Sequence, residues 1–135
     1  MVDYVTGLEP RGRLEERLAA VVPGGEPPAM LIIDVVGLKA VNEDQGFLAG
    51  DAVLRAAADR LRVAAADAVS LARLGGDELV ALFLGPMAGE TARRAADRLA
   101  AATSPPALRS AALTAARGET AARFIERLYA TLRRC

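Results

Sequence analysis

Two acidic segments of the sequence have residue types and a setting that suit a metal site. Asp34 interrupts the apolar run of residues 29–36, and Asp77 and Glu78 follow the glycine pair Gly75-Gly76. A carboxylate in a buried strand is costly unless an ion pair, hydrogen bonds or a cation compensate its charge. If both segments are neighbours in one sheet, their oxygens can converge on Mg²⁺ or Mn²⁺, which also bind substrate phosphates.

Each acidic segment also has an ordinary structural interpretation. Asp34 can cap the helix that follows its strand, and residues 75–78 can form a polar hairpin turn whose glycines permit positive φ and a close approach of a ligand. The whole chain can likewise be a structural α/β module in which the acidic hairpin has no catalytic role. The metal hypothesis therefore depends on the two segments occurring together.

The apolar patterns predict which elements position these acids. Short apolar runs bounded by turn residues predict strands at 29–36, 69–74 and 79–84, and more weakly at 108–115. Apolar residues at helical spacing predict helices within 3–20, at 38–44, from Asp51 to about Arg62, at 88–101 and at 119–134, with residues 22–28 breaking the first. The 135 residues suffice for a single domain, residues 1–135. We expect an α/β (α+β) sandwich with a mixed, mostly antiparallel sheet flanked by helices, and residues 75–78 on a β-hairpin.

The composition excludes several other classes of site and partner. Histidine is absent, which excludes histidine-based zinc sites and catalytic triads, and Cys135 is the single cysteine, so there is no disulfide framework. Lys plus Arg (17) balance Asp plus Glu (17), so no general attraction to nucleic acid or anionic membrane is expected. Without a membrane-length apolar run or a signal-peptide pattern, we expect a cytoplasmic domain that does not insert into a membrane.

Three blocks of the sequence resemble the GGDEF domains, many of which are diguanylate cyclases. Residues 3–11 are similar to the family's lead-in D-x-L-T-G-L-x-N-R, with Pro10 in place of Asn. Residues 34–51 are similar to D-x-D-x-F-K-x-x-N-D-x-x-G-H-x-x-G-D without a gap, and residues 75–79 match the signature loop. Three blocks in this order are far more specific than a single G-G-D-E.

The resemblance implies a palm-like nucleotidyl-cyclase fold and metal-assisted condensation of two GTP molecules into cyclic di-GMP. Asp34, Asp77 and the carbonyl of Val35 would hold Mg²⁺ or Mn²⁺, and Glu78 would lie beside the metal and the attacking 3′-hydroxyl. Each domain would bind one GTP, so catalysis would require a second GGDEF domain in a homodimer. A sensor or receiver domain often precedes such domains in a longer protein.

The same resemblance implies the residues that bind GTP. Lys39 and the backbone amides around Leu38 would cradle the triphosphate, as a lysine and a helix start can. Asn42 and Asp51 would recognise guanine, and Asp51 can also be a helix N-cap. Gly75 and Gly76 would leave room for the nucleotide beside the catalytic acids.

Several positions depart from the family pattern. Val36 replaces the second aspartate of D-x-D, Leu38 replaces the aromatic before the lysine, Glu43 replaces Asp, Phe47 replaces the histidine, and Leu79 replaces the last aromatic of the signature. Most of these changes alter shape, and we expect only Leu38 to lie against the phosphates.

The C-terminal part departs further. Leu132 stands where the family has a phosphate-binding lysine, the chain is short after it, and Ser110-Ala111-Ala112 stands for S-x-G. Arg133 or Arg134 would be a weaker substitute clamp. The product-inhibition motif R-x-x-D falls on residues 66–69, which lack it, so that inhibition is expected to be absent. These changes support an alternative: a degenerate, inactive module that binds GTP or acts in regulation or dimerisation.

Overall fold

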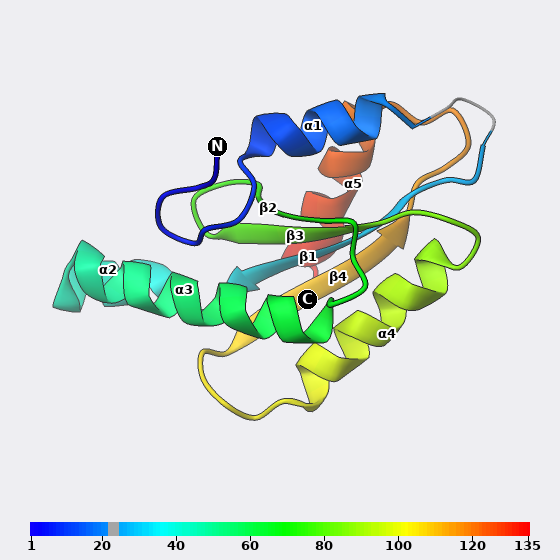
Figure 1. Cartoon of the computed structure of the whole chain (residues 1–135). Helices are drawn as coiled ribbons and strands as arrows, with labels where there is room; N and C mark the ends of the chain where they lie inside the picture. The colour runs from blue at the N-terminus through cyan, green and yellow to red at the C-terminus, as the bar shows by residue number, and fades with distance from the viewer. Residues whose placement is uncertain (22–24) are drawn as a thin grey trace.

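A computed structural model describes residues 1–21 and 25–135. Four strands form one sheet in the order β2-β3-β1-β4, and the three strand pairings are antiparallel (Figure 1). The strands are β1 (Ala29–Val35), β2 (Ser70–Arg73), β3 (Glu78–Phe83) and β4 (Leu108–Thr114). The expected sandwich with a mostly antiparallel sheet is confirmed, although the break predicted at 22–28 begins with residues outside the described ones.

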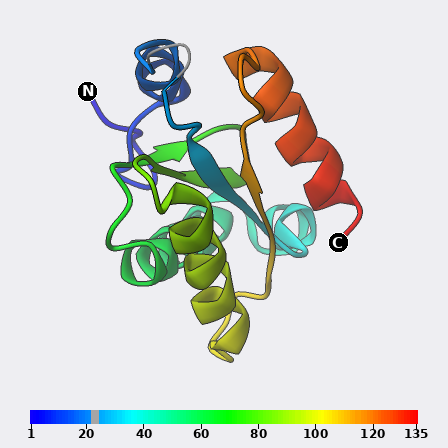
Figure 2. The ribbon, with the colours of Figure 1, turned by 90° about the vertical axis from the view of Figure 1, so that its right-hand side faces the viewer.

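Helices cover both faces of this sheet. Helices α1 (Arg11–Ala19) and α5 (Ala121–Arg133) pack on one face, whereas α3 (Phe47–Ala64) and α4 (Ala88–Ala101) pack on the other, as Figures 1 and 2 show. The short helix α2 (Leu38–Gln45) packs against α3. No helix among the described residues is both long enough and apolar enough to cross a bilayer.

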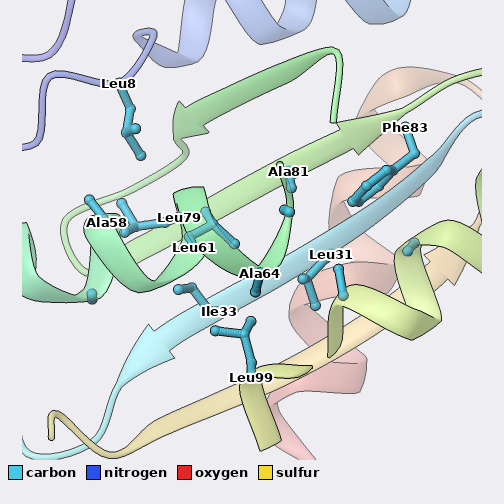
Figure 3. Packing of buried hydrophobic residues seen from close by; sticks show 14 of the residues in the cluster. Leu8, Leu31, Ile33, Ala58, Leu61, Ala64, Leu79, Ala81, Phe83 and Leu99 are labelled. Carbon is cyan, nitrogen blue, oxygen red and sulfur yellow. The ribbon is translucent and has the colours of Figure 1, made fainter. Parts of the chain in front are cut away.

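The central strand β1 places its side chains alternately in two cores. Leu31 and Ile33 belong to the cluster beneath α3 and α4, part of which Figure 3 shows, whereas Met30 and Ile32 belong to the cluster beneath α1 and α5. Because successive strand residues point to opposite faces, Asp34 lies on the α1 and α5 side. It is at the end of the strand, where the core gives way to the candidate site.

One predicted helix boundary is wrong. The third helix begins at Phe47, not at Asp51, because Gly46 with φ of 90° ends α2 and caps α3. Asp51 therefore lies in the second turn of α3 and is not its N-cap. The other predicted helices and strands match observed elements, with small shifts at their ends; α4 has the predicted bounds.

Candidate active site

The sheet register brings the two acidic segments together. Asp34 on β1 is the direct cross-strand partner of Glu78 on β3, so the expected pairing of these segments is confirmed. Directly opposite side chains in an antiparallel pair lie within contact range. On its other side, Asp34 is the cross-strand partner of Arg109 on β4. Asp34 thus lies between an acidic residue, Glu78, and a positively charged residue, Arg109.

Arg109 is the ion-pair partner of Asp34. Its Nε donates to Oδ1 of Asp34 over 2.9 Å, and its Nη2 donates to Oδ2. Asp34 is only 5% exposed, and the hydrogen bond to its carboxylate is the main cause that raises the pKa of Arg109. Arg109 was not predicted as a site residue, because the sequence pattern of residues 108–115 does not indicate which strand pairs with them.

Glu78 is half-buried at the start of β3. Burial, followed by the interaction with Asp77, raises the pKa of Glu78 to about 7, and the charge of Asp34 adds to this effect. The hydroxyl of Tyr129 on α5 donates to Oε1 of Glu78 over 3.0 Å, which lowers the pKa in part. Burial in turn raises the pKa of Tyr129 to about 12. Tyr129 is a second residue that the sequence reasoning did not assign to the site.

The two glycines of the signature loop have different surroundings. A Cβ added to Gly75 would lie 2.0 Å from Oε1 of Glu78 and 3.1 Å from the hydroxyl of Tyr129, whereas a Cβ added to Gly76 would meet nothing within 4 Å. Gly75 therefore makes room for the Glu78 carboxylate. Neither glycine has a positive φ, so the prediction that they allow a turn with positive φ is wrong.

Arg73 holds the signature loop in place. Its Nε donates to the carbonyl of Gly75 (3.2 Å), and its Nη2 donates to the carbonyl of Gly76 (2.6 Å). Its Nη1 donates to Oδ1 of Asp3 (3.2 Å), and Asp3 also accepts from the backbone and hydroxyl of Thr6. The lead-in block near the N-terminus thus supports the loop through Arg73, although it was not assigned a role in the site.

A cleft of about 360 Å³ lies between the signature loop and helices α2 and α3. It brings together six of the residues predicted from the sequence: Leu38, Lys39, Asn42, Asp51, Gly76 and Asp77. Phe47, Gly50, Leu54 and Arg73 complete its lining. The other predicted residues, Asp34, Val35, Gly75 and Glu78, are not part of this lining and lie at the adjoining end of the sheet.

The start of α2 presents its first residues in different directions. The turn from β1 into α2 passes through Gly37, which has φ of 79°. Leu38 is buried in the core, whereas the side chain of Lys39 is 90% exposed, with Nζ 3.9 Å from Oε1 of Glu43. Lys39 can therefore swing toward a ligand at low cost, and the helix start offers backbone amides to a phosphate.

Close packing of α2 on α3 positions Asn42 next to Asp51. A Cβ added to Gly50 would lie 1.7 Å from Oδ1 of Asn42. Only glycine at this position lets Asn42 keep its place. Asn42 and Asp51 line the same cleft, which gives it an amide and a carboxylate for hydrogen bonds to a polar ring.

The acids suit a hard divalent cation that arrives with a phosphate ligand. Across residues 1–21 and 25–135, no group of three or more acidic or cysteine side chains gathers as a complete metal cluster. Mg²⁺, however, often uses one or two carboxylates and takes waters and substrate phosphates as its remaining ligands. The charges of Asp34 and Asp77 both raise the pKa of Glu78, so this end of the sheet favours a bound positive charge.

The C-terminal helix leaves no lysine at the expected phosphate site. Leu132 is buried in the core beneath α1 and α5, and Arg133 and Arg134 are exposed. The thiol of Cys135 donates to the carbonyl of Ser110 (3.2 Å), so the last residue lies against β4.

Comparisons with known proteins agree with the resemblance. Residues 1–127 match the family model described as "Diguanylate cyclase, GGDEF domain". Diguanylate cyclase DgcP of Pseudomonas aeruginosa is 38% identical over 106 residues, which cover 76% of this chain and 16% of that protein. An uncharacterized protein of Mycobacterium tuberculosis is 40% identical over 101 residues, covering 72% of this chain and again 16% of the relative. This chain therefore corresponds to a small part of these relatives.

Among solved structures, a sensory box/GGDEF family protein from Caulobacter crescentus CB15 is 33% identical. It superposes with a TM-score of 0.80, covering 98% of this chain and 96% of that one. The GGDEF domain of PA1120 (TpbB or YfiN) from Pseudomonas aeruginosa also gives a TM-score of 0.80, at 26% identity.

Proposed function

Because the chain belongs to the GGDEF domain family, we propose that it is a diguanylate cyclase that joins two GTP molecules into cyclic di-GMP. The observation that carries the proposal is the cleft in which Lys39, Asn42 and Asp51 lie opposite Asp77. Asn42 and Asp51 offer hydrogen-bonding groups for a base, and Asp77 offers a carboxylate for a metal-bound phosphate. The proposal treats residues 1–135 as one domain.

The cleft residues divide into base and phosphate contacts. Asp51 can accept hydrogen bonds from the N1–H and exocyclic amine of guanine, and adenine has no such pair of donors. Asn42, fixed against Gly50, adds a second contact to the base. The exposed Lys39 and the amides around Leu38 bind the triphosphate, and the open surface at Gly76 leaves room for it.

Asp34, Asp77 and the Val35 carbonyl hold Mg²⁺ or Mn²⁺ in this proposal. When bound, one such ion would lower the pKa of the 3′-hydroxyl and another would neutralise the leaving pyrophosphate. Glu78 lies beside these acids with a pKa of about 7. The Glu78 carboxylate, held by the hydrogen bond from Tyr129, takes the proton of the attacking hydroxyl in this proposal.

Each cleft takes one GTP, so two copies of the domain must face each other for catalysis. The partner is a second GGDEF domain, and in a longer protein a sensor or receiver domain can control that pairing. The balanced charge supports a nucleotide partner held by local contacts, in place of nucleic acid. The proposal places the domain in the cytoplasm, where GTP is available.

A second candidate function follows from two particular residues. Leu132 is buried where the family has a phosphate-binding lysine, and Arg109 is paired with the proposed metal ligand Asp34. Both features favour an inactive module that binds GTP or acts in regulation or dimerisation. The two candidates differ in whether the domain converts GTP to cyclic di-GMP.

The test is a product assay on an enforced dimer. The domain is fused to a dimeric coiled coil and incubated with GTP and Mg²⁺, and cyclic di-GMP is separated by chromatography. An active cyclase gives product that Asp77→Ala abolishes. A folded dimer that binds GTP but forms no product supports the inactive module, and full activity of Asp77→Ala refutes the metal assignment.

A further inference from the structure

Arg109 and Asp34 form an ion pair that occupies both oxygens of the carboxylate. They are direct partners across β1 and β4, so the sheet register fixes their neighbourhood. One guanidinium nitrogen donates to each oxygen of Asp34, the Nε contact being 2.9 Å. A buried carboxylate requires a compensating positive charge, and Arg109 supplies it.

We propose that the Arg109 guanidinium competes with the divalent cation for Asp34, so that metal binding requires Arg109 to leave the carboxylate. The inference rests on the proposed function, because it takes Asp34 as a metal ligand. Mg²⁺ approaches its oxygen ligands to about 2.0–2.1 Å. A guanidinium in front of the same two oxygens repels that cation and blocks its approach.

The structure allows Arg109 to move while Asp34 stays in place. β4 is an edge strand of the sheet, and the side chain of Arg109 is 40% exposed, whereas that of Asp34 is 7% exposed. Rotation of the arginine side chain alone can therefore carry the guanidinium into solvent. Asp34 then faces Glu78 without a counter-charge, and two adjacent carboxylates favour a divalent cation.

The expected size of the competition follows from the effect of a nearby charge on a carboxylate. An adjacent positive charge changes the proton affinity of a carboxylate by about 10- to 1000-fold. A divalent cation carries twice the charge of a proton, so it experiences at least a comparable penalty. Arg109→Gln removes the charge and keeps a hydrogen-bond donor, and it should bind Mn²⁺ at least about tenfold more tightly than the wild type.

The chain offers a closely matched control pair. Arg127 and Glu119 form a bidentate ion pair whose side chains are 42% and 7% exposed, nearly the values for Arg109 and Asp34. This pair joins α5 to the segment before it and does not line the cleft. Arg127→Gln should therefore leave the Mn²⁺ affinity unchanged.

The experiment measures free Mn²⁺ by electron paramagnetic resonance during titration of the full chain, with GTP present and absent. The proposal is supported if Arg109→Gln binds about tenfold more tightly, Arg127→Gln binds as the wild type does, and Asp34→Asn loses binding. Wild-type affinity in Arg109→Gln, with binding lost in Asp34→Asn, overturns the competition but keeps the metal site. Unchanged binding in Asp34→Asn overturns the competition and the metal assignment together.

Thermal unfolding gives a second readout that does not depend on turnover. Mn²⁺ should raise the melting temperature of Arg109→Gln by more than that of the wild type, because a ligand stabilises the folded state according to its affinity. If Arg109→Gln does not fold, Arg109→Met decides, since methionine also removes the charge while it keeps an unbranched side chain. Arg109→Met should then bind Mn²⁺ more tightly than the wild type, and wild-type affinity in Arg109→Met overturns the proposal.

Discussion

Gly75→Ala should destabilise the domain through Glu78. The added Cβ would lie 2.0 Å from Oε1 of Glu78 and 3.1 Å from the hydroxyl of Tyr129. The carboxylate is the mobile end of its side chain, so it moves away and loses the 3.0 Å hydrogen bond from Tyr129. A lost hydrogen bond costs about 0.5–1.5 kcal/mol, and a displaced rotamer costs a similar amount.

Part of this loss is offset because alanine reduces the conformational entropy of the unfolded chain, by about 0.4–1 kcal/mol. The free energy of unfolding of Gly75→Ala should therefore fall by about 1–2 kcal/mol, out of a total of about 5–15 kcal/mol. Urea unfolding followed by circular dichroism measures the change. Gly76→Ala is the matched control, because its Cβ meets nothing within 4 Å, and it should raise the free energy of unfolding by about 0.4–1 kcal/mol through the same entropy effect.

A double-mutant cycle tests the physical cause. In a Glu78→Ala background the obstructing carboxylate is gone, so Gly75→Ala should cost close to nothing there. The same cost in both backgrounds would show that the destabilisation has another origin, and the reasoning from the 2.0 Å contact between the added Cβ and Oε1 would be wrong.

Three further predictions concern titration and ligand binding. The pKa of Glu78 is raised from 4.5 to about 7, so protonation of Glu78 stabilises the folded state, and this stabilisation is lost as pH rises between these values. The free energy of unfolding of the wild type should therefore fall by about 1 kcal/mol relative to Glu78→Gln, after allowance for solvent screening. Urea unfolding at about pH 5 and pH 8 measures the difference. The pKa of Glu119 is lowered to about 2, mainly by its hydrogen bonds from Arg127. Glu119→Gln should therefore lower the free energy of unfolding by about 1 kcal/mol at neutral pH, and by progressively less as pH falls from 4.5 toward 2. A loss of stability that does not change with pH would contradict this. Gly50→Ala would place Cβ 1.7 Å from Oδ1 of Asn42, so the Asn42 side chain must move away. The affinity for GTP, measured by calorimetry, should fall about tenfold because one hydrogen bond is lost. Unchanged affinity would show that Asn42 does not bind GTP.

Local patterns predicted the strands and helices well because each pattern needs only neighbouring residues. The apolar run around Asp34 and the glycine pair before Asp77 identified β1 and the hairpin without knowledge of their contacts. The start of α3 was misplaced because Asp51 is a common N-cap type, whereas the observed break depends on the backbone of Gly46. The prediction relied on the residue type of Asp51, whereas the backbone conformation of Gly46 decides where α3 begins.

The ion pair and hydrogen bond that set the charge of the site were not predictable in the same way. Arg109 lies 75 residues from Asp34 in sequence, and Tyr129 lies 51 residues from Glu78. Both contacts depend on the strand order and on how α5 packs on the sheet, which periodicity does not specify. The cleft residues Lys39, Asn42 and Asp51 were predicted through the resemblance of residues 34–51 to the GGDEF domains, and α2 and α3 bring them to one cleft.

The two unusual features of the site concern one quantity, the positive charge at this end of the sheet. Leu132, at the α5 position where the resemblance implies a phosphate-binding lysine, is buried in the core. Arg109 places a cation on β4, on the face that α5 covers. Ser110, which follows Arg109, accepts a hydrogen bond from the thiol of Cys135, so the end of α5 lies close to Arg109. We propose that the Arg109 guanidinium, once it leaves Asp34, supplies the positive charge that a lysine on α5 would otherwise bring to the phosphates. Leu132→Lys in the Arg109→Gln background therefore separates a degenerate site from a rearranged one. A loss of GTP affinity in Arg109→Gln that Leu132→Lys restores indicates rearrangement. No loss in Arg109→Gln shows that Arg109 makes no phosphate contact, and a loss that Leu132→Lys does not restore indicates that position 132 no longer reaches the phosphates.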